Sequence, residues 1–352
     1  MAERDPVADL REIAFRLERA HEPTYRVRAF RTAAGVLADL GPEEVRRRAA
    51  AGTLTDLKGI GKATAAAVAQ SLAGEEPEYL GKLPVGDAPV VSGGASLRAA
   101  LRGDLHTHSD WSDGGSPIEE MMAAARRLGH EYTALTDHSP RLTVARGLTA
   151  ERLERQLDLV DSLNAALEGR FRILTGIEVD ILDDGSLDQS AELLSRLDVV
   201  VASVHSGLRQ PSEAMTPRMV AAIANPHTDV LGHCTGRLLR GTPGESRRPS
   251  QRPESDFDAE IVFEACRRFG VAVEINSRPE RLDPPTRLLK LAVQTGCLFS
   301  IDTDAHAPGQ LDWQPYGCER AETCAVPASS VVNTWPLADL LAWTANHTHR
   351  PA

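Results

Sequence analysis

Nine histidine and acidic residues between positions 106 and 306 could together bind metal ions. Most of them follow a short apolar run, and the first two form a His-x-His pair. Alternate residues of an extended strand lie on the same side, so this pair can share one ion. Imidazole and carboxylate ligands suit zinc, manganese or iron, and a site with few thiolates is typical of hydrolases rather than of structural metal sites. The nine candidate ligands are His106, His108, Asp113, His138, Glu178, His205, His233, Asp304 and His306.

The segments that would position these ligands alternate between strands and helices from about residue 101. This alternation predicts a parallel α/β sheet that closes into a barrel. Because the carboxyl ends of all barrel strands meet at one face, ligands far apart in the sequence would converge there. Strands are predicted from apolar runs near 132–136, 172–179, 197–204, 229–232, 271–275 and 297–302. Helices are predicted at 117–128, 151–167, 188–196, 257–269 and 286–294.

The N-terminal part of the chain has a different pattern. In residues 1–80 apolar side chains recur at intervals of three and four, which predicts a small all-α domain. Residues 81–100 are punctuated by glycine and proline, which predicts a linker, and residues 101–345 would form the barrel.

Composition limits the compartment and the partners. The net charge of −11 is unusual for a nucleic-acid-binding protein, but the first 82 residues contain 13 basic and 13 acidic residues, so the excess lies in the barrel region. No apolar run approaches the ~18 residues of a membrane span, and the N-terminus lacks the apolar stretch of a signal peptide. We therefore expect a cytoplasmic protein with no membrane partner. The five scattered cysteines favour reduced thiols over a disulfide framework.

Across roughly residues 102–345 the chain resembles the polymerase-and-histidinol-phosphatase (PHP) family of metal-dependent phosphoesterases. The resemblance implies a distorted (β/α)7 barrel and a site for three divalent metal ions, commonly Zn, Mn or Fe. The motifs that carry it are Asp104-Leu-His-Thr-His-Ser109, Ser112-Asp-Gly114, Thr136-Asp-His-Ser139, Gly176-Ile-Glu178, Ser203-Val-His205, Gly232-His233 and Asp302-Thr-Asp-Ala-His306.

The resemblance also implies how the ligands divide among the three ions. Glu178 would bridge the first two ions. The three sets would be His106, His108, Glu178 and Asp304, then Glu178, His205 and His233, then Asp113, His138 and His306.

Adjacent metal ions could activate a water molecule and stabilise an in-line displacement at phosphorus without a side-chain nucleophile. Arginines in loops after the strands could bind the phosphate in a bidentate manner, although surface arginines are common in this chain. The predicted catalytic residues are Glu178, Asp304, Arg146, Arg237 and Arg278.

Three further segments are similar to the PHP domain of bacterial X-family DNA polymerases, or else serve only as scaffold. They are Ala145-Arg-Gly-Leu148, Thr235-Gly-Arg-Leu-Leu239 and Glu274-Ile-Asn-Ser-Arg-Pro-Glu-Arg-Leu-Asp283.

The segment Leu57-Lys-Gly-Ile-Gly-Lys-Ala-Thr-Ala65 resembles a helix-hairpin-helix, and the residues before it are similar to the N-terminal domain of X-family polymerases. Glycines permit a tight turn, and the amides at the start of the next helix could bind a DNA phosphate. An amphipathic helical cap is the alternative. The predicted DNA-binding residues are Arg26, Arg28, Arg31, Lys58, Gly59, Gly61 and Lys62.

Two departures from the X-family limit the expected activity. Only the linker separates the two regions, where those polymerases have their nucleotidyl-transfer palm, so we expect no polymerase activity. The lysine used by some members for deoxyribose-phosphate lyase chemistry would correspond to Ala67, whose side chain is inert, so we expect no lyase activity by that route. The sequence therefore predicts DNA 3′-end processing in repair, as a 3′–5′ exonuclease or 3′-phosphatase. The alternatives are a small-molecule phosphomonoesterase, for example one acting on histidinol phosphate, and a non-catalytic DNA-binding module.

Overall fold

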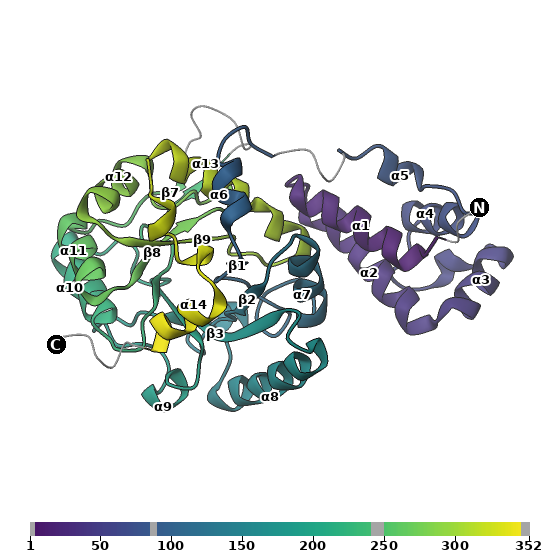
Figure 1. Ribbon diagram of the computed structural model, residues 1–352. Helices are drawn as coiled ribbons and strands as arrows, with labels where there is room; N and C mark the ends of the chain where they lie inside the picture. The colour runs from purple at the N-terminus through teal and green to yellow at the C-terminus, as the bar shows by residue number, and fades with distance from the viewer. Residues whose placement is uncertain (1–3, 85–89, 241–249, 346–352) are drawn as a thin grey trace. The chain divides into compact units, whose positions relative to one another are not determined.

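The computed structural model describes residues 4–84, 90–240 and 250–345, which form two compact units. The first unit contains helices α1 to α5, and the second contains the seven-stranded sheet and the helices around it (Figure 1). The division into 1–80, 81–100 and 101–345 stays a prediction.

The second unit is built on a parallel sheet in the order β1-β2-β3-β4-β5-β8-β9. A parallel bridge between Thr107 and Ala305 joins its two edges, so the sheet is nearly closed. The predicted (β/α)7 barrel is therefore confirmed. Its strands are β1 Gly103–Asp104, β2 Tyr132–Leu135, β3 Arg172–Asp180, β4 Val199–Ser203, β5 Val230–Leu231, β8 Ala272–Asn276 and β9 Leu298–Asp302.

Helices surround the barrel (Figure 1). They are α7 Ile118–Arg127, α8 Ala150–Leu167, α9 Ala191–Leu194, α10 Ser212–Ile223, α11 Ala259–Phe269, α12 Thr286–Thr295, α13 Gln314–Thr323 and α14 Leu337–Ala345. The sequence pattern did not predict α10, because Pro217 lies inside it and interrupts the helical signal. Short β6 Leu238–Leu239 and β7 Ser250–Arg252 form a separate antiparallel pair. In the described part of the chain, no helix has the length and apolar character needed to cross a membrane.

Alternation along the strands separates two cores. On β4, Val199 and Val201 pack in the cluster that also contains Leu340 of α14, whereas Val200 and Ala202 pack in a different cluster with the surrounding helices. Side chains two residues apart lie on the same side of a strand. His205 lies four residues after Val201 and therefore on the same side of the chain as Val199 and Val201. The same alternation thus places apolar side chains inside the barrel and a candidate metal ligand at its end.

The first unit packs around a core that includes Leu10, Ile13, Leu17, Phe30 and Leu37. Asp5 caps the first helix by accepting a hydrogen bond from the Val7 amide at 2.9 Å. The helices are α1 Pro6–Arg19, α2 Thr24–Leu40, α3 Pro42–Ala51, α4 Lys62–Leu72 and α5 Glu78–Gly81.

Part of the segment predicted as a linker is ordered. Helix α6, Ala95–Ala100, lies within it and begins after Gly94. A Cβ at Gly94 would lie 2.4 Å from the Cys318 backbone, and the Gly94 amide donates to Glu322 at 2.7 Å. Gly94, one of the glycines behind the linker prediction, is thus needed for a close approach to α13. Three of the six residues of α6 are alanines, the residue with the strongest helix propensity.

The five cysteines are free and buried. Burial raises the pKa of the Cys234 and Cys266 thiols well above the usual value. These side chains are therefore protonated and are unsuitable as nucleophiles or metal ligands at neutral pH.

We expect the folding stability of the protein to depend on pH through His130, which lies between α7 and β2. Burial, with a smaller contribution from Arg98, lowers its pKa to about 3, whereas the unfolded chain has a pKa of about 6.5. The unfolded state then binds a proton between these values that the folded state does not. The stabilisation is fully present above pH 6.5 and is lost as the pH falls. We expect the free energy of unfolding, measured with urea, to fall between pH 6.5 and pH 4.5 by about 2 kcal/mol more in the unsubstituted protein than in the His130→Gln variant. If the free energy of unfolding falls equally in the two proteins, His130 is charged in the folded state.

Candidate metal centre

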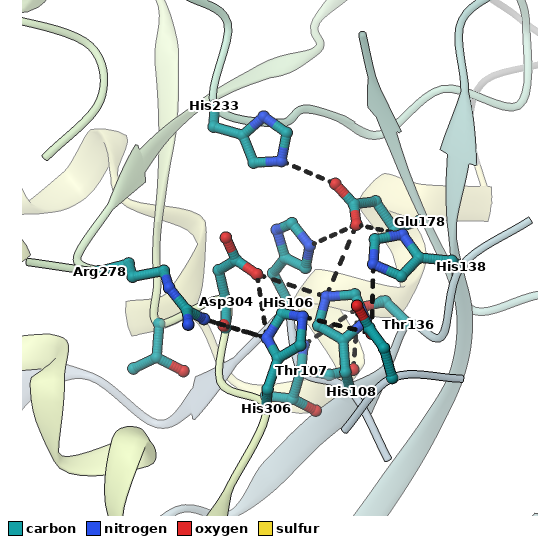
Figure 2. A network of polar contacts seen from close by, with 12 residues as sticks. His106, Thr107, His108, Thr136, His138, Glu178, His233, Arg278, Asp304 and His306 are labelled. Carbon is teal, nitrogen blue, oxygen red and sulfur yellow. Dashed lines mark hydrogen bonds and ion pairs between the residues drawn. The ribbon is translucent and has the colours of Figure 1, made fainter. Parts of the chain in front are cut away.

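The nine candidate ligands converge at the carboxyl ends of the barrel strands. Glu178 lies within β3, and the other eight follow β1, β2, β4, β5 and β9 directly or lie in the adjoining loops. In Figure 2 the side chains gathered around Glu178 are those of His106, His108, His138, His233, Asp304 and His306. A set of residues spread over most of the barrel sequence therefore forms one cluster.

Three groups of these side chains have ligand atoms within 4.8 Å of one another. They are His108, Asp113, His138 and His306; His106, His108 and Asp304; and His138, Glu178 and His205. The groups resemble the division implied by the sequence but overlap, because His108 and His138 each belong to two of them. His233 joins none of the groups and instead contacts Glu178. The ligand assignment stays a prediction.

Glu178 is the centre of the cluster. It is 1% exposed, and its Oε1 lies 2.8 Å from His233 Nε2 and 3.2 Å from His205 Nε2. Its Oε2 lies 2.9 Å from His138 Nδ1 and 3.3 Å from His106 Nε2. Burial raises the pKa of this carboxyl, but the imidazoles of His205, His106 and His138 outweigh it and hold the pKa well below its usual range. Its Oε2 also lies 3.6 Å from His108 Nε2, so Glu178 is an anion surrounded by five imidazoles.

Several ring nitrogens and oxygens in the cluster are buried without a hydrogen-bond partner among the described residues. They include His106 Nε2, both ring nitrogens of His108, His205 Nε2 and Glu178 Oε2. Unpaired buried polar atoms are costly, so a concentration of them indicates a missing partner. Each of these side chains offers at least one lone pair suited to a divalent cation, and the residues therefore fit the metal ions that the sequence implies.

The electrostatics of His108 also fit metal binding. Burial lowers its pKa well below the usual value, and the neighbouring His306 and His138 act in the same direction. Its ring centroid lies 4.2 Å from that of His306 and 4.5 Å from that of His138. A neutral imidazole is the form that coordinates a metal.

Asp113 lies on a loop that the buried Asp137 holds in place. Asp137 accepts hydrogen bonds from the Ser109 amide and hydroxyl at 2.8 and 2.6 Å. The side chain of Asp113 is 36% exposed and lies 3.5 Å from His138 and 3.4 Å from His306. Asp113 therefore lies on the open side of the cluster.

The predicted catalytic arginines differ in their surroundings. The Arg146 guanidinium donates to the carbonyls of Asp110 and Ser112, and that of Arg237 donates to the carbonyls of Arg281 and Leu282. Both of these side chains brace loops. Arg278 also donates to a backbone carbonyl, that of Asp304 at 2.8 Å, but it lies beside the cluster, where its Nη1 is 3.1 Å from His306 Nδ1 (Figure 2). Their catalytic role stays a prediction, and these contacts favour Arg278.

Sequence reasoning did not single out Arg281 as a site residue. Its Nε lies 2.8 Å from Asp304 Oδ2. Burial raises the pKa of Asp304, but the positive charge of Arg281 and the neighbouring histidines outweigh burial and hold this pKa well below the usual range. Arg281 lies in the segment 274–283, whose similarity to the X-family PHP domain was the available signal.

The predicted DNA-binding residues lie in two places in the first unit: the glycines and lysines at the hairpin, and the three arginines on α2. Gly59 has a φ of +97° and packs against α2, where a Cβ would lie 2.8 Å from Thr32 Cγ2. The Gly61 amide donates to Thr64 Oγ1 at 2.9 Å and is therefore occupied. The next amides, at the start of α4, have no intrahelical acceptors.

Among the predicted cations of this unit, two are paired with acidic residues. Arg31 forms a bidentate pair with Glu18 at 2.9 and 2.8 Å, and Arg26 pairs with Glu22. Arg28, Lys58 and Lys62 are exposed and form no ion pair with the described residues. Tyr25, which is exposed and was not among the predicted DNA-binding residues, lines a pocket of about 510 Å³ with Arg28 and Gly59.

Residues 104–278 match the PHP domain family, and residues 1–76 match a helix-hairpin-helix domain family. The chain is 40% identical over 243 residues to the DNA polymerase/3′-5′ exonuclease PolX of Bacillus subtilis (strain 168), a match that covers 69% of this chain and 41% of that protein. The chain therefore spans about two fifths of the length of this relative.

A probable phosphatase of Thermoanaerobacter sp. (strain X514) is 31% identical over 214 residues, which cover 58% of this chain and 78% of that protein. Among solved structures, the histidinol phosphate phosphatase of Lactococcus lactis subsp. lactis Il1403, complexed with zinc, L-histidinol and phosphate, matches with a TM-score of 0.46 and 18% identity. That match covers 65% of this chain and 94% of the other.

Proposed function

The chain belongs to the PHP family and is a metal-dependent phosphoesterase, and we propose that it processes the 3′ ends of DNA. Removal of a 3′ nucleotide and removal of a 3′ phosphate are both hydrolyses of a phosphate ester. Both would use the same cluster and expel a deoxyribose 3′ oxygen. They differ in the phosphorus that water attacks, which is a diester joined to the terminal nucleoside in the first reaction and a monoester in the second.

The observation that carries this proposal is the helix-hairpin-helix unit on the same chain as the metal cluster. Arg28, Lys58 and Lys62 are exposed on that unit and are not neutralised by ion pairs within the described residues. Uncommitted cations beside a helix N-terminus suit phosphate contacts that carry no sequence preference. A tethered DNA-binding unit would raise the effective concentration of DNA ends at the barrel. The name of the Bacillus subtilis relative supports the same substrate.

The proposed chemistry divides between the ions and the side chains. Divalent ions, when bound, lower the pKa of water and offset the charge of a phosphate. The residues that would hold them are the nine candidate ligands His106, His108, Asp113, His138, Glu178, His205, His233, Asp304 and His306. Arg278, whose side chain is 21% exposed, would bind a phosphate oxygen beside His306.

The double substitution Lys58→Glu with Lys62→Glu tests the role of the hairpin. We expect it to reduce hydrolysis of a 3′-labelled gapped DNA by about 10-fold or more at low salt, because two phosphate contacts become repulsive. Hydrolysis of p-nitrophenyl phosphate should be unchanged. Lys82→Glu with Lys290→Glu makes the same change in net charge elsewhere and serves as the control. Equal rates for both variants on DNA would contradict the hairpin's role.

A small-molecule phosphomonoesterase is the second candidate. The net charge of −11 and the Thermoanaerobacter relative, named a probable phosphatase, favour it. Parallel assays of gapped DNA and histidinol phosphate with manganese and with zinc separate the two functions. Turnover of DNA alone supports end processing, and turnover of the small ester alone supports the second candidate.

A further inference from the structure

Strand β8 differs from the other barrel strands. Six of the seven strands contain or precede a candidate metal ligand, but β8 has none among the residues that the structure describes. In that position it carries Glu274 and Asn276, two residues apart and both 0% exposed. Residues two apart on a strand share a face, and Ala272 of the same set lies in the cluster that fills the barrel. The inner face of β8 is therefore polar at the end where the metal cluster lies.

Glu274 contacts residues from two parts of that cluster. Its Oε1 lies 2.6 Å from His106 Nδ1, and its Oε2 accepts a hydrogen bond from the backbone amide of His233. Asn276 extends the network, because its Nδ2 donates to Glu274 Oε2 at 3.2 Å and to Asp304 Oδ2 at 3.3 Å. One buried carboxylate thus connects three candidate ligands that arise from three other strands.

The contact to His106 determines which ring nitrogen faces the cluster. An imidazole whose Nδ1–H donates to a carboxylate presents the lone pair of Nε2. His106 Nε2 is buried, has no hydrogen-bond partner among the described residues, and lies 3.3 Å from Glu178 Oε2. The orientation needed for metal binding is therefore the one that Glu274 imposes.

Asp180 makes a similar contact but to a single ligand. Its Oδ1 lies 2.6 Å from His205 Nδ1, and His205 Nε2 is also buried without a hydrogen-bond partner. The described contacts of Asp180 include no other candidate ligand. The two carboxylates thus differ in reach: Asp180 orients one ring, whereas Glu274 supports His106 and His233.

We propose that Glu274 is a positioning residue that couples the loading of two metal ions, one bound through His106 and one through His233. This proposal rests on the ligand roles proposed above. Loss of Glu274 frees the His106 ring and at the same time leaves the His233 amide without its acceptor, so both ions bind more weakly. Loss of the Asp180 carboxylate affects only the ion bound by His205.

Zinc titration of the metal-stripped full chain, followed by native mass spectrometry, tests the proposal. Outer contacts of this kind change metal affinity by about 10–100-fold. We expect Glu274→Gln to weaken two binding steps by that factor, and Asp180→Asn, the matched carboxylate-to-amide change, to weaken one. Histidine ¹⁵N spectra of the zinc-loaded protein provide a second measurement: Glu274→Gln should move the ring resonances of His106, and Asp180→Asn those of His205.

Three results would overturn the proposal. Wild-type affinities in Glu274→Gln would show that the carboxylate does not position ligands. A single weakened step would remove the coupling. Absence of zinc binding by the unsubstituted chain would refute the metal centre itself, which is a separate failure of the proposed function. If Glu274→Gln does not fold, Glu274→Asp, which is too short to reach both partners, should weaken the same two steps.

Discussion

Replacing Glu178 with glutamine is expected to reduce phosphoester hydrolysis by at least about 1,000-fold, a loss of about 4 kcal/mol of transition-state stabilisation. Glu178 is nearly isosteric with glutamine, but the substitution removes a buried carboxylate that contacts five imidazoles, those of His106, His108, His138, His205 and His233. An amide offers a weaker ligand and turns an N–H group toward ring nitrogens or cations. Metal binding and charge balance should therefore fail together.

The rates of Glu178→Gln and the unsubstituted chain should be compared on DNA and on p-nitrophenyl phosphate, with circular dichroism to confirm folding. Glu154→Gln is a matched control, because Glu154 is exposed and its one ion pair with a described residue is with Arg196 at 3.3 Å. The control should retain full activity. Undiminished hydrolysis by a folded Glu178→Gln would refute the central role of this carboxylate on either substrate.

The barrel could be predicted because the alternation of apolar residues along a strand and the position of the ligand after it both indicate which side of the strand faces the barrel interior. His138 continues the inner register of Tyr132 and Ala134, and Glu178 continues that of Leu174, which all pack in the barrel interior. On these two strands, alternation places the ligand on the inner side four residues after an interior side chain. On β5 it does not, because His233 lies two residues after Leu231 of the outer cluster. The convergence of the ligands then follows from the parallel topology.

Pairings between distant side chains could not be read from the sequence. Arg31 looked available for DNA, but Glu18, thirteen residues earlier, holds its guanidinium. Arg146 and Arg237 are occupied by backbone carbonyls of neighbouring loops, whose positions depend on the folded chain. The sharing of His108 and His138 between ligand groups likewise depends on distances of a few ångströms.

Chelation of the metal ions is expected to abolish hydrolysis and to lower the melting temperature of the barrel by roughly 10 °C. An ion present at 1,000 times its dissociation constant stabilises the folded state by about 4 kcal/mol, and each kcal/mol corresponds to about 2–4 °C in a domain of this size. Without the ions, the buried atoms of His106, His108, His205 and Glu178 that lack hydrogen-bond partners stay unsatisfied. Zinc or manganese should restore both activity and stability.

Tryptophan fluorescence reports the unfolding of the barrel unit and not that of the helical unit. All four tryptophans, Trp111, Trp313, Trp335 and Trp343, belong to the second unit, and the metal-ligand groups found in the described residues also lie there. A fall in the fluorescence melting temperature on chelation therefore reports ions bound in the barrel. Loss of activity with an unchanged melt would mean that the ions act in catalysis without stabilising the fold. Full activity after chelation would contradict metal-dependent hydrolysis, because no buried thiol offers an alternative nucleophile.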